Sequence, residues 1–292
     1  MKKRLIENGL AHVVPRFKVF DPAEVSADYS QNLVNTVGLP IFCKPTDGSG
    51  AKNACILSNI EEISSWIQKN MHQSSGAFEF DQFITGEMYH CDSIVKNNKI
   101  LHVQVFRYLY PCFDFHKGRL CASIVVLPEN PMYKKSLSFN EIIFNGLQSI
   151  PDGVTHHEFF KTEDDRFMFV EIAARPPGVL ICPAHELNIG LNLKLVHYKL
   201  QMGLDFDLLI QPGFHSAWAT FPKKTGKVVR LNYPNHLRSN FHFEHSKDNA
   251  TGPRHNLWLP SSNILLWNTN YEILEQDLQS LKNFSPTETI ED

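Results

Sequence analysis

Residues 44–52 read Lys-Pro-Thr-Asp-Gly-Ser-Gly-Ala-Lys and follow a short apolar run, 39–43, that predicts a strand. A lysine at the end of a strand offers phosphate a point charge, and the glycines after it let backbone N–H groups approach phosphate oxygens. The lysine precedes the glycines and no Gly-Lys-Ser/Thr triplet follows, so the segment is not a P-loop. Taken alone, it is either a phosphate-binding loop or an exposed hairpin with a solvated lysine.

Two glutamates, Glu158 and Glu171, lie in segments 154–162 and 166–172, which predict two strands joined by a polar turn. On an antiparallel pair, residues almost opposite each other can project to the same face. Two such carboxylates repel unless a cation lies between them, and Mg²⁺ prefers carboxylates together with substrate phosphates. The alternative is a pair of exposed hairpin glutamates. The bulky apolar neighbours of Glu171 disfavour that alternative.

Arg175 begins the stretch Arg-Pro-Pro-Gly, four residues after Glu171. The prolines and the glycine predict a stiff, irregular turn. An arginine held there can clamp a transferring phosphoryl group with two hydrogen bonds. The alternative is a surface arginine on a loop.

The rest of the chain mixes strands and helices without strict βαβ alternation, which predicts α+β lobes. Strands are expected at 39–44, 54–57, 78–84, 89–96, 99–108, 154–162 and 166–172, with strand-like patterns at 214–232 and 254–268. Helices are expected at 2–8, 21–37, 59–70, 140–149, 191–202 and 271–281, and the residues after Asn283 as a frayed end.

Composition excludes several classes of protein. The chain has 292 residues, a formal net charge of -3 and 42% hydrophobic residues, which is ordinary for a globular protein and gives no basic excess for nucleic acid. No apolar run approaches the length of a membrane helix. The six cysteines form no Cys-x-x-Cys pair, so we expect reduced thiols in a cytoplasmic protein.

Three blocks of sequence, in this order and spacing, resemble the ATP-grasp superfamily over nearly the whole chain. They are Gly38–Pro45 with the glycine-rich loop, Asp81–Gly86, and His157-Glu158 followed by Val170–Arg175. The resemblance implies an α+β fold in which two α+β lobes hold ATP between them. Within the superfamily, the chain looks most similar to carboxylate–amine ligases, including amino-acid ligases.

The resemblance also implies roles for particular residues. Lys44 and Arg175 would be catalytic, with Lys44 on the α- and β-phosphates and Arg175 facing the transferred phosphate. Glu158 and Glu171 would hold Mg²⁺, or Mn²⁺ in its place. ATP would further contact a mobile flap, residues 47–52, and an adenine hinge, residues 81–84, through Gly48, Ser49, Gly50, Asp81, Gln82, Phe83 and Ile84.

Two positions depart from the pattern that the resemblance implies. The family usually has asparagine two residues after the second metal glutamate, where this chain has Ala173. It usually has an acidic ribose ligand two residues after the hinge glycine, where this chain has Met88; Glu87 or Asp92 are the candidate substitutes.

The implied reaction is ATP-dependent and forms ADP: a small carboxylate becomes an acyl phosphate, and an amine attacks it. The physical logic holds, because carboxylate is a poor electrophile and phosphate is a good leaving group. A second hypothesis is a non-catalytic nucleotide-binding remnant of such an enzyme, which Ala173 and Met88 favour. A third, a biotin-dependent carboxylase, has only the shared blocks in its support.

Three further residues are candidates for the substrate side of the cleft. Arg107 either holds the substrate carboxylate or forms a structural salt bridge. His90 is more often a packed core histidine than a base, and His156 beside Glu158 is the better candidate. The stretch His242-Phe243-Glu244-His245 fits no zinc motif, so we expect a polar strand or loop edge.

The resemblance also suggests a division of the chain and a missing part. Residues 1–15 would begin the core, 16–84 form the lid subdomain, 85–205 the large subdomain and 206–292 a C-terminal subdomain. The family usually carries an earlier α/β domain and a lysine eleven residues before the position of Gly9, which falls before Met1. Lys2 and Lys3 are the wrong distance away. We therefore expect either that an N-terminal domain is missing or that a partner chain supplies it. The apolar patch left by its loss would favour self-association, for example as a homodimer.

Overall fold

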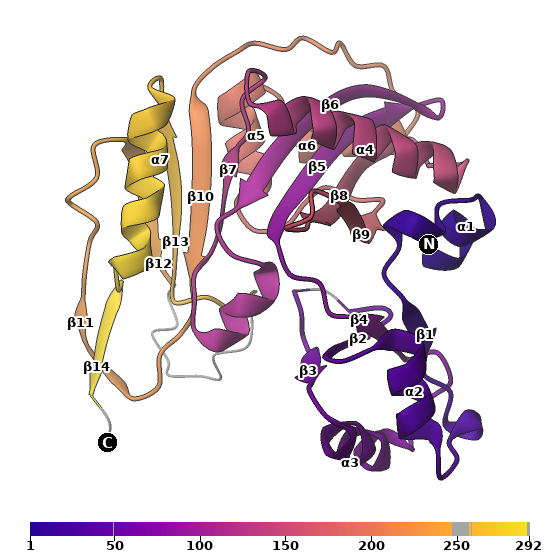
Figure 1. Cartoon of the computed structure of the whole chain (residues 1–292). Coiled ribbons are helices and arrows are strands. Elements are labelled where there is room, and N and C mark those ends of the chain that lie inside the picture. The colour runs from indigo at the N-terminus through magenta and orange to yellow at the C-terminus, as the bar shows by residue number, and fades with distance from the viewer. Residues whose placement is uncertain (49, 247–256, 258, 291–292) are drawn as a thin grey trace.

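The structure is a computed structural model that describes the chain except residues 49, 247–256, 258 and 291–292 (Figure 1). The predicted α+β class is confirmed. The helices are α1 (Lys2–Glu7), α2 (Tyr29–Val37), α3 (Ile60–Asn70), α4 (Pro131–Leu147), α5 (Ile181–Ile189), α6 (Leu193–Gln201) and α7 (Tyr271–Ser280). The strands are β1 (Phe17–Val19), β2 (Ile41–Pro45), β3 (Cys55–Leu57), β4 (Phe78–Gln82), β5 (Glu87–Lys96), β6 (Lys99–Tyr108), β7 (Cys121–Val125), β8 (Gly153–Lys161), β9 (Phe167–Ala173), β10 (His215–Phe221), β11 (Lys227–Leu231), β12 (Asn240–His245), β13 (Ser262–Asn268) and β14 (Thr287–Ile290).

A small antiparallel sheet, in the order β1-β4-β2-β3, forms the lower lobe of Figure 1 with α2 and α3. Asn59 starts α3, because its side chain accepts a hydrogen bond of 2.8 Å from the N–H of Glu62. The helix then buries Ile63 and Ile67, spaced four residues apart on one face. These contacts hold β2, and with it Lys44, at the upper edge of the lobe.

A large antiparallel sheet of eight strands, in the order β12-β13-β10-β7-β6-β5-β8-β9, forms the rest of the core. Alternate residues of β5 face opposite sides of this sheet. On one side, Cys91 packs in the core that α4 completes with Ile143; on the other, Ile94 packs with Val196 of α6. Helix α7 covers β10 and β13, and β11 pairs with β14 in a separate ribbon.

Several elements differ from the sequence prediction. The expected helix 21–37 is a short 3-10 turn at Pro22–Glu24 followed by α2, because Val25 takes an extended conformation between them. Helix α4 begins nine residues earlier than expected, where Asn130 caps it and Pro131 occupies its first position. Residues 287–290, expected to be frayed, pair with β11.

Both asparagines of the predicted Asn97-Asn98 turn have positive φ, 53° and 56°, as a two-residue hairpin turn requires. All six thiols are free. Within the described part of the chain, no helix is long and apolar enough to cross a membrane. The four-part division of the chain stays a prediction, and we note that β10, β12 and β13 share one sheet with β5.

Candidate functional site

A cavity of about 490 Å³ lies between the small and the large sheet. It collects side chains from segments far apart in the sequence, on β2, β4, β8 and β9. The predicted site residues that line it are Lys44, Gly48, Gly50, Asp81, Gln82, Phe83, Ile84, His156, Glu158, Glu171 and Arg175. Ser49 lies outside the described residues.

Lys44 comes from the end of β2 and crosses the cavity. Its Nζ lies 3.3 Å from Oε2 of Glu171, on the other sheet, and 3.5 Å from Oε1 of Glu79. Burial alone lowers the pKa of this amine, but Glu171, Asp81 and Glu79 together raise it. Lys44 is therefore an ammonium group aimed into the cavity, as a phosphate contact must be.

The hinge segment is held by a lysine that the sequence did not place here. Nζ of Lys2 lies 2.8 Å from Oε1 of Glu79 and 2.5 Å from Oδ1 of Asp81, and only 6% of the lysine is exposed. Burial raises the pKa of Asp81, whereas Glu79 has a lowered pKa because Lys2 and Lys44 outweigh its burial. Lys2 thus lies in the cavity wall, although its spacing from Gly9 does not match that of the lysine that the family resemblance implies.

The backbone of the hinge is fixed by two hydrogen bonds. The N–H of Gln82 donates to the carbonyl of Arg16 at 2.8 Å, and the N–H of Phe83 donates to the carbonyl of Pro40 at 3.2 Å. These bonds fix the backbone where β4 ends at Gln82, and residues 82–84 line the cavity wall.

Glu158 and Glu171 are register partners on β8 and β9, with a β-bulge directly after Glu158. Oε1 of Glu158 accepts hydrogen bonds from the hydroxyl of Tyr108 at 2.6 Å and from Nε2 of His156 at 3.3 Å. Burial raises the pKa of Glu158, but these partners outweigh it and lower the pKa to about 2. The cavity therefore presents two adjacent carboxylates, one of them firmly ionised.

This donor set fits Mg²⁺, a hard cation that takes oxygen ligands and usually binds one or two carboxylates plus substrate phosphates. Glu158 and Glu171 would hold it. Ala173, on the same face of β9 two residues on, offers no side-chain oxygen. The remaining ligands would have to come from water or nucleotide.

Arg175 and the glycine-rich loop complete the cavity wall. Nη1 of Arg175 donates to the carbonyl of Pro176 at 2.9 Å, and this exposed residue lines the cavity. In the loop, Gly50, Ala51 and Asn53 all have positive φ, between 55° and 62°. The backbone there is therefore left-handed and does not continue as a strand.

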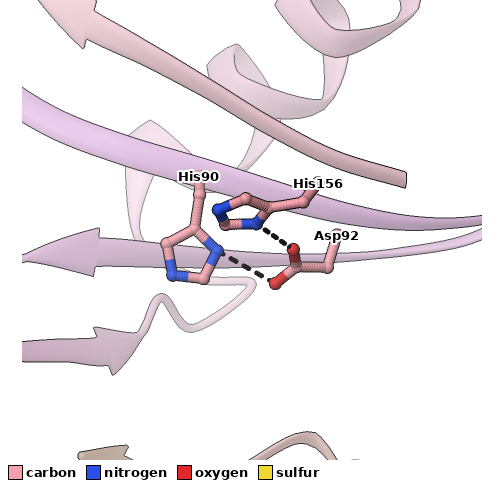
Figure 2. A group of neighbouring side chains, drawn as sticks. All are labelled: His90, Asp92 and His156. Carbon is pink, nitrogen blue, oxygen red and sulfur yellow. Dashed lines mark hydrogen bonds and ion pairs between the residues drawn. The ribbon is translucent and has the colours of Figure 1, made fainter. Parts of the chain in front are cut away.

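Next to the cavity lies a buried cluster that sequence reasoning only partly anticipated. Figure 2 shows His90 and His156 directed at the two oxygens of Asp92, with Nδ1 to oxygen distances of 2.9 and 2.6 Å. Nε2 of His185, on α5, contacts the same carboxylate at 2.8 Å. Burial lowers the pKa of His156, but Asp92 and Glu158 outweigh it and raise it to about 10.

Four sequence candidates for ligand contacts do not line the cavity. Asp92 is 1% exposed and three imidazoles occupy its oxygens, which argues against a ribose contact. His90 is fully buried in the same cluster, as expected for a packed core histidine.

Nη2 of Arg107 lies 2.6 Å from Oε1 of Glu275 on α7. Of the two alternatives for Arg107, the structure therefore shows the salt bridge. Glu87, the other ribose candidate, also lies outside the lining and 3.7 Å from Arg107.

Other cavity residues carried no signal in the sequence. Tyr108 ends β6 and reaches Glu158, and Cys112 lies on the following turn with its Sγ 3.8 Å from the same carboxylate. Only the pairing of β5 with both β6 and β8 brings them together. His242 and Glu244 lie exposed on β12, 4.0 Å apart, in agreement with a polar strand rather than a zinc site.

No protein-family model matches the chain. A curated relative, the L-arginine-specific L-amino acid ligase of Bacillus subtilis, is 24% identical over 181 residues, which are 60% of this chain. These residues are 43% of the relative, so the match spans less than half of its length. Among solved structures, L-amino acid ligase from Bacillus licheniformis has a TM-score of 0.72 at 16% identity, over 100% of this chain and 71% of that one.

The chain has the ATP-grasp fold. A further structural neighbour is the biotin carboxylase domain of 2-oxoglutarate carboxylase from Hydrogenobacter thermophilus, solved with MgADP, ADP and bicarbonate. Its TM-score is 0.63 at 15% identity, over 98% of this chain and 66% of that one. The ATP-grasp blocks named from the sequence thus lie in a fold that matches solved structures end to end.

Proposed function

We propose that this ATP-grasp protein is an ADP-forming ligase that uses ATP and Mg²⁺ to convert a small carboxylate to an acyl phosphate, which an amine then attacks. The observation that carries the proposal is the convergence of Lys44, Glu158 and Glu171 in one cavity between two sheets. One cation and two carboxylates there match the charges of a nucleotide and its metal ion. The L-amino acid ligases among the comparisons support the same reaction class.

Each part of the cavity has a task under this proposal. Lys44 and Arg175 supply positive charge for the phosphates. Mg²⁺, when bound, would neutralise the negative charge that develops on the transferred phosphoryl group. Ionised Glu158, held by two hydrogen bonds, keeps one ligand oxygen in a fixed position. The hinge at 82–84 orients the base. Closing the two sheets over the cavity excludes water that would hydrolyse an acyl phosphate.

A nucleotide-binding protein without ligase activity is the second candidate, and two residues in or beside the cavity favour it. Met88 lines the wall and Ala173 follows Glu171 on β9, at positions where polar ligands are expected. Such a protein would bind ATP without consuming it.

The experiment that separates the two candidates measures ADP released by the full chain with ATP, Mg²⁺ and a panel of amino acids, alone and in pairs. Ligase activity gives ADP only when an acceptor pair is present, together with one dipeptide per ADP. ATP binding by calorimetry without ADP release across the panel would favour the non-catalytic candidate. Absence of both binding and turnover overturns the proposal.

A further inference from the structure

The nucleotide site uses the cluster of His90, Asp92 and His156 only through the hydrogen bond from His156 to Glu158. One ring nitrogen of each histidine and a carboxylate oxygen lie within 4.8 Å of one another. The three residues come from adjacent strands, since β5 carries His90 and Asp92, and His156 is the register partner of Asp92 on β8. A single sheet therefore fixes their relative positions.

From this arrangement we infer that His90, His156 and Asp92 form a binding site for a divalent transition metal ion, separate from the Mg²⁺ of the nucleotide site. Two imidazoles and one carboxylate suit Zn²⁺, Co²⁺ or Fe²⁺, whereas Mg²⁺ selects oxygen. Ligand bonds of about 2.0–2.2 Å allow two ligand atoms of one ion to lie up to about 4 Å apart. The cluster needs only small side-chain shifts to meet that limit.

Each candidate ligand also has an outer hydrogen-bond partner. Nε2 of His90 lies 3.2 Å from Oγ of Ser123, and Nε2 of His156 lies 3.3 Å from Oε1 of Glu158. Both partners can accept a hydrogen bond from the outer nitrogen, which frees Nδ1 of each ring for an ion. This is the support that metal-binding histidines almost always have.

His185 gives the carboxylate the same support. Its Nε2 donates to Oδ2 of Asp92 at 2.8 Å, so it can hold one oxygen while the other binds the ion. His185 lies on α5, packed beneath the sheet. A bound ion would therefore fix α5 to β5 and β8.

The burial of the four side chains in the cluster is a further argument for a bound ion. His90 and His185 are 0% exposed, Asp92 is 1% and His156 is 7%. Four ionisable side chains in a core cost free energy that hydrogen bonds only partly recover. An ion that binds the folded chain alone adds its binding free energy to stability.

The test uses the full chain, stripped with chelator and free of nucleotide, and titrates it with Co²⁺ while recording visible absorption. We expect one Co²⁺ per chain with the intense d–d bands of a low-coordinate site, and a rise of Tm with Co²⁺ or Zn²⁺. His90→Gln and Asp92→Asn should abolish the bands. His185→Gln should weaken binding about 10- to 100-fold, as loss of an outer partner does.

Two matched variants establish where the ion binds. His157→Gln removes another buried histidine of β8, one that bonds Asn140 instead, and should leave the Co²⁺ bands unchanged. Glu171→Gln, in the nucleotide cavity, should also leave them unchanged. If Glu171→Gln abolishes the bands, the ion sits at the cavity carboxylates and the inference is wrong.

One measurement needs no variant, in case the substitutions unfold the chain. The wild-type Co²⁺ form should show two hyperfine-shifted, exchangeable imidazole N–H signals, one from each outer nitrogen. Their absence, or no Co²⁺ binding above that of a denatured chain, overturns the site. All these readouts are independent of ATP and of ligase activity.

Discussion

Nζ of Lys44, on the small sheet, lies 3.3 Å from Oε2 of Glu171, on the large sheet, and this ion pair crosses the cavity between the two lobes. The amine is 15% exposed and the carboxylate 39%. In the same cavity Glu171 is the register partner of Glu158. The carboxylate of Glu171 is therefore attracted by the ammonium of Lys44 and repelled by the carboxylate of Glu158.

The first prediction removes this carboxylate with Glu171→Gln. We expect ADP formation to fall at least 100-fold, because one of two metal ligands is lost. Stability should stay within about 1 kcal/mol, since the lost attraction between Lys44 and the partly exposed Glu171 is offset by relief of repulsion from Glu158. Turnover and urea unfolding measure the two effects. Glu163→Gln, on the exposed turn after β8, is the control, and undiminished turnover in Glu171→Gln rules out the metal role.

The second prediction concerns the glycine-rich loop. We expect backbone amides of residues 47–48 and 50–53 to exchange faster than those of β2 and β3 without nucleotide, and to slow by at least 10-fold with an ATP analogue and Mg²⁺. Phosphate oxygens would accept hydrogen bonds from these amides, and closing the loop would order it. Hydrogen exchange of the full chain measures this. Equal exchange in both states would contradict a phosphate contact by the loop.

Much of the fold could be predicted because its signals are local. Asn97-Asn98 requires a tight turn, and the polar turn between β8 and β9 makes these two strands neighbours. That hairpin brings Glu158 within one residue of Glu171 in register, and the β-bulge directly after Glu158 makes the two residues partners. The element α5 was missed because its sequence, Ile181–Ile189, is apolar on most sides and shows no helical stripe, as a helix buried all round does not.

The rest of the site depends on long-range pairing that no local pattern contains. Lys2 contacts residues 77 and 79 positions away, and its spacing from Gly9 argued against a role in the cavity. His90 and Asp92 are two residues apart on β5, so the sequence places them on the same side of the sheet. Nothing in the sequence says that His185 of α5 covers that side.

The third prediction tests how Glu158 is held. Tyr108→Phe removes a hydrogen bond of 2.6 Å to its Oε1 and leaves the ring packed. We expect the Mg²⁺ concentration for half-maximal ADP formation to rise about 10-fold, because the ligand loses an outer partner, while kcat at saturating Mg²⁺ changes little. Tyr110→Phe, on the next turn, is the control. A fall in kcat with no change in Mg²⁺ dependence would assign Tyr108 to another step.

The fourth prediction concerns Lys2, whose ammonium lies between the carboxylates of buried Asp81 and of Glu79, which is 14% exposed. Lys2→Met leaves these carboxylates with one cation fewer, and loss of one partner of a buried pair costs about 3 kcal/mol. The double variant Lys2→Met/Asp81→Asn should recover part of that loss, since one carboxylate has gone. Urea unfolding measures both, with Lys3→Met as the exposed control. A loss no larger than that of Lys3→Met would show that the pair carries no net stability.

The last prediction is a pH dependence that originates at His102 on β6. Burial, with a smaller contribution from His185, lowers its pKa to about 4, and its Nε2 has no hydrogen-bond partner among the described residues. Unfolding restores a pKa near 6.5, so between pH 6.5 and 4 the unfolded chain binds a proton that the folded chain does not. Stability from this group is therefore present above pH 6.5 and lost as the pH falls toward 4.

His102→Gln should remove that contribution. The free energy of unfolding of the wild type should fall more steeply with acid than that of the variant, by up to about 1.4 kcal/mol per pH unit, which is one proton. Urea unfolding at several pH values measures the two slopes. His72→Gln, an exposed histidine, should leave the slope unchanged. Parallel wild-type and His102→Gln curves would mean that His102 takes up its proton equally in the folded and unfolded chain, and the burial argument would then fail.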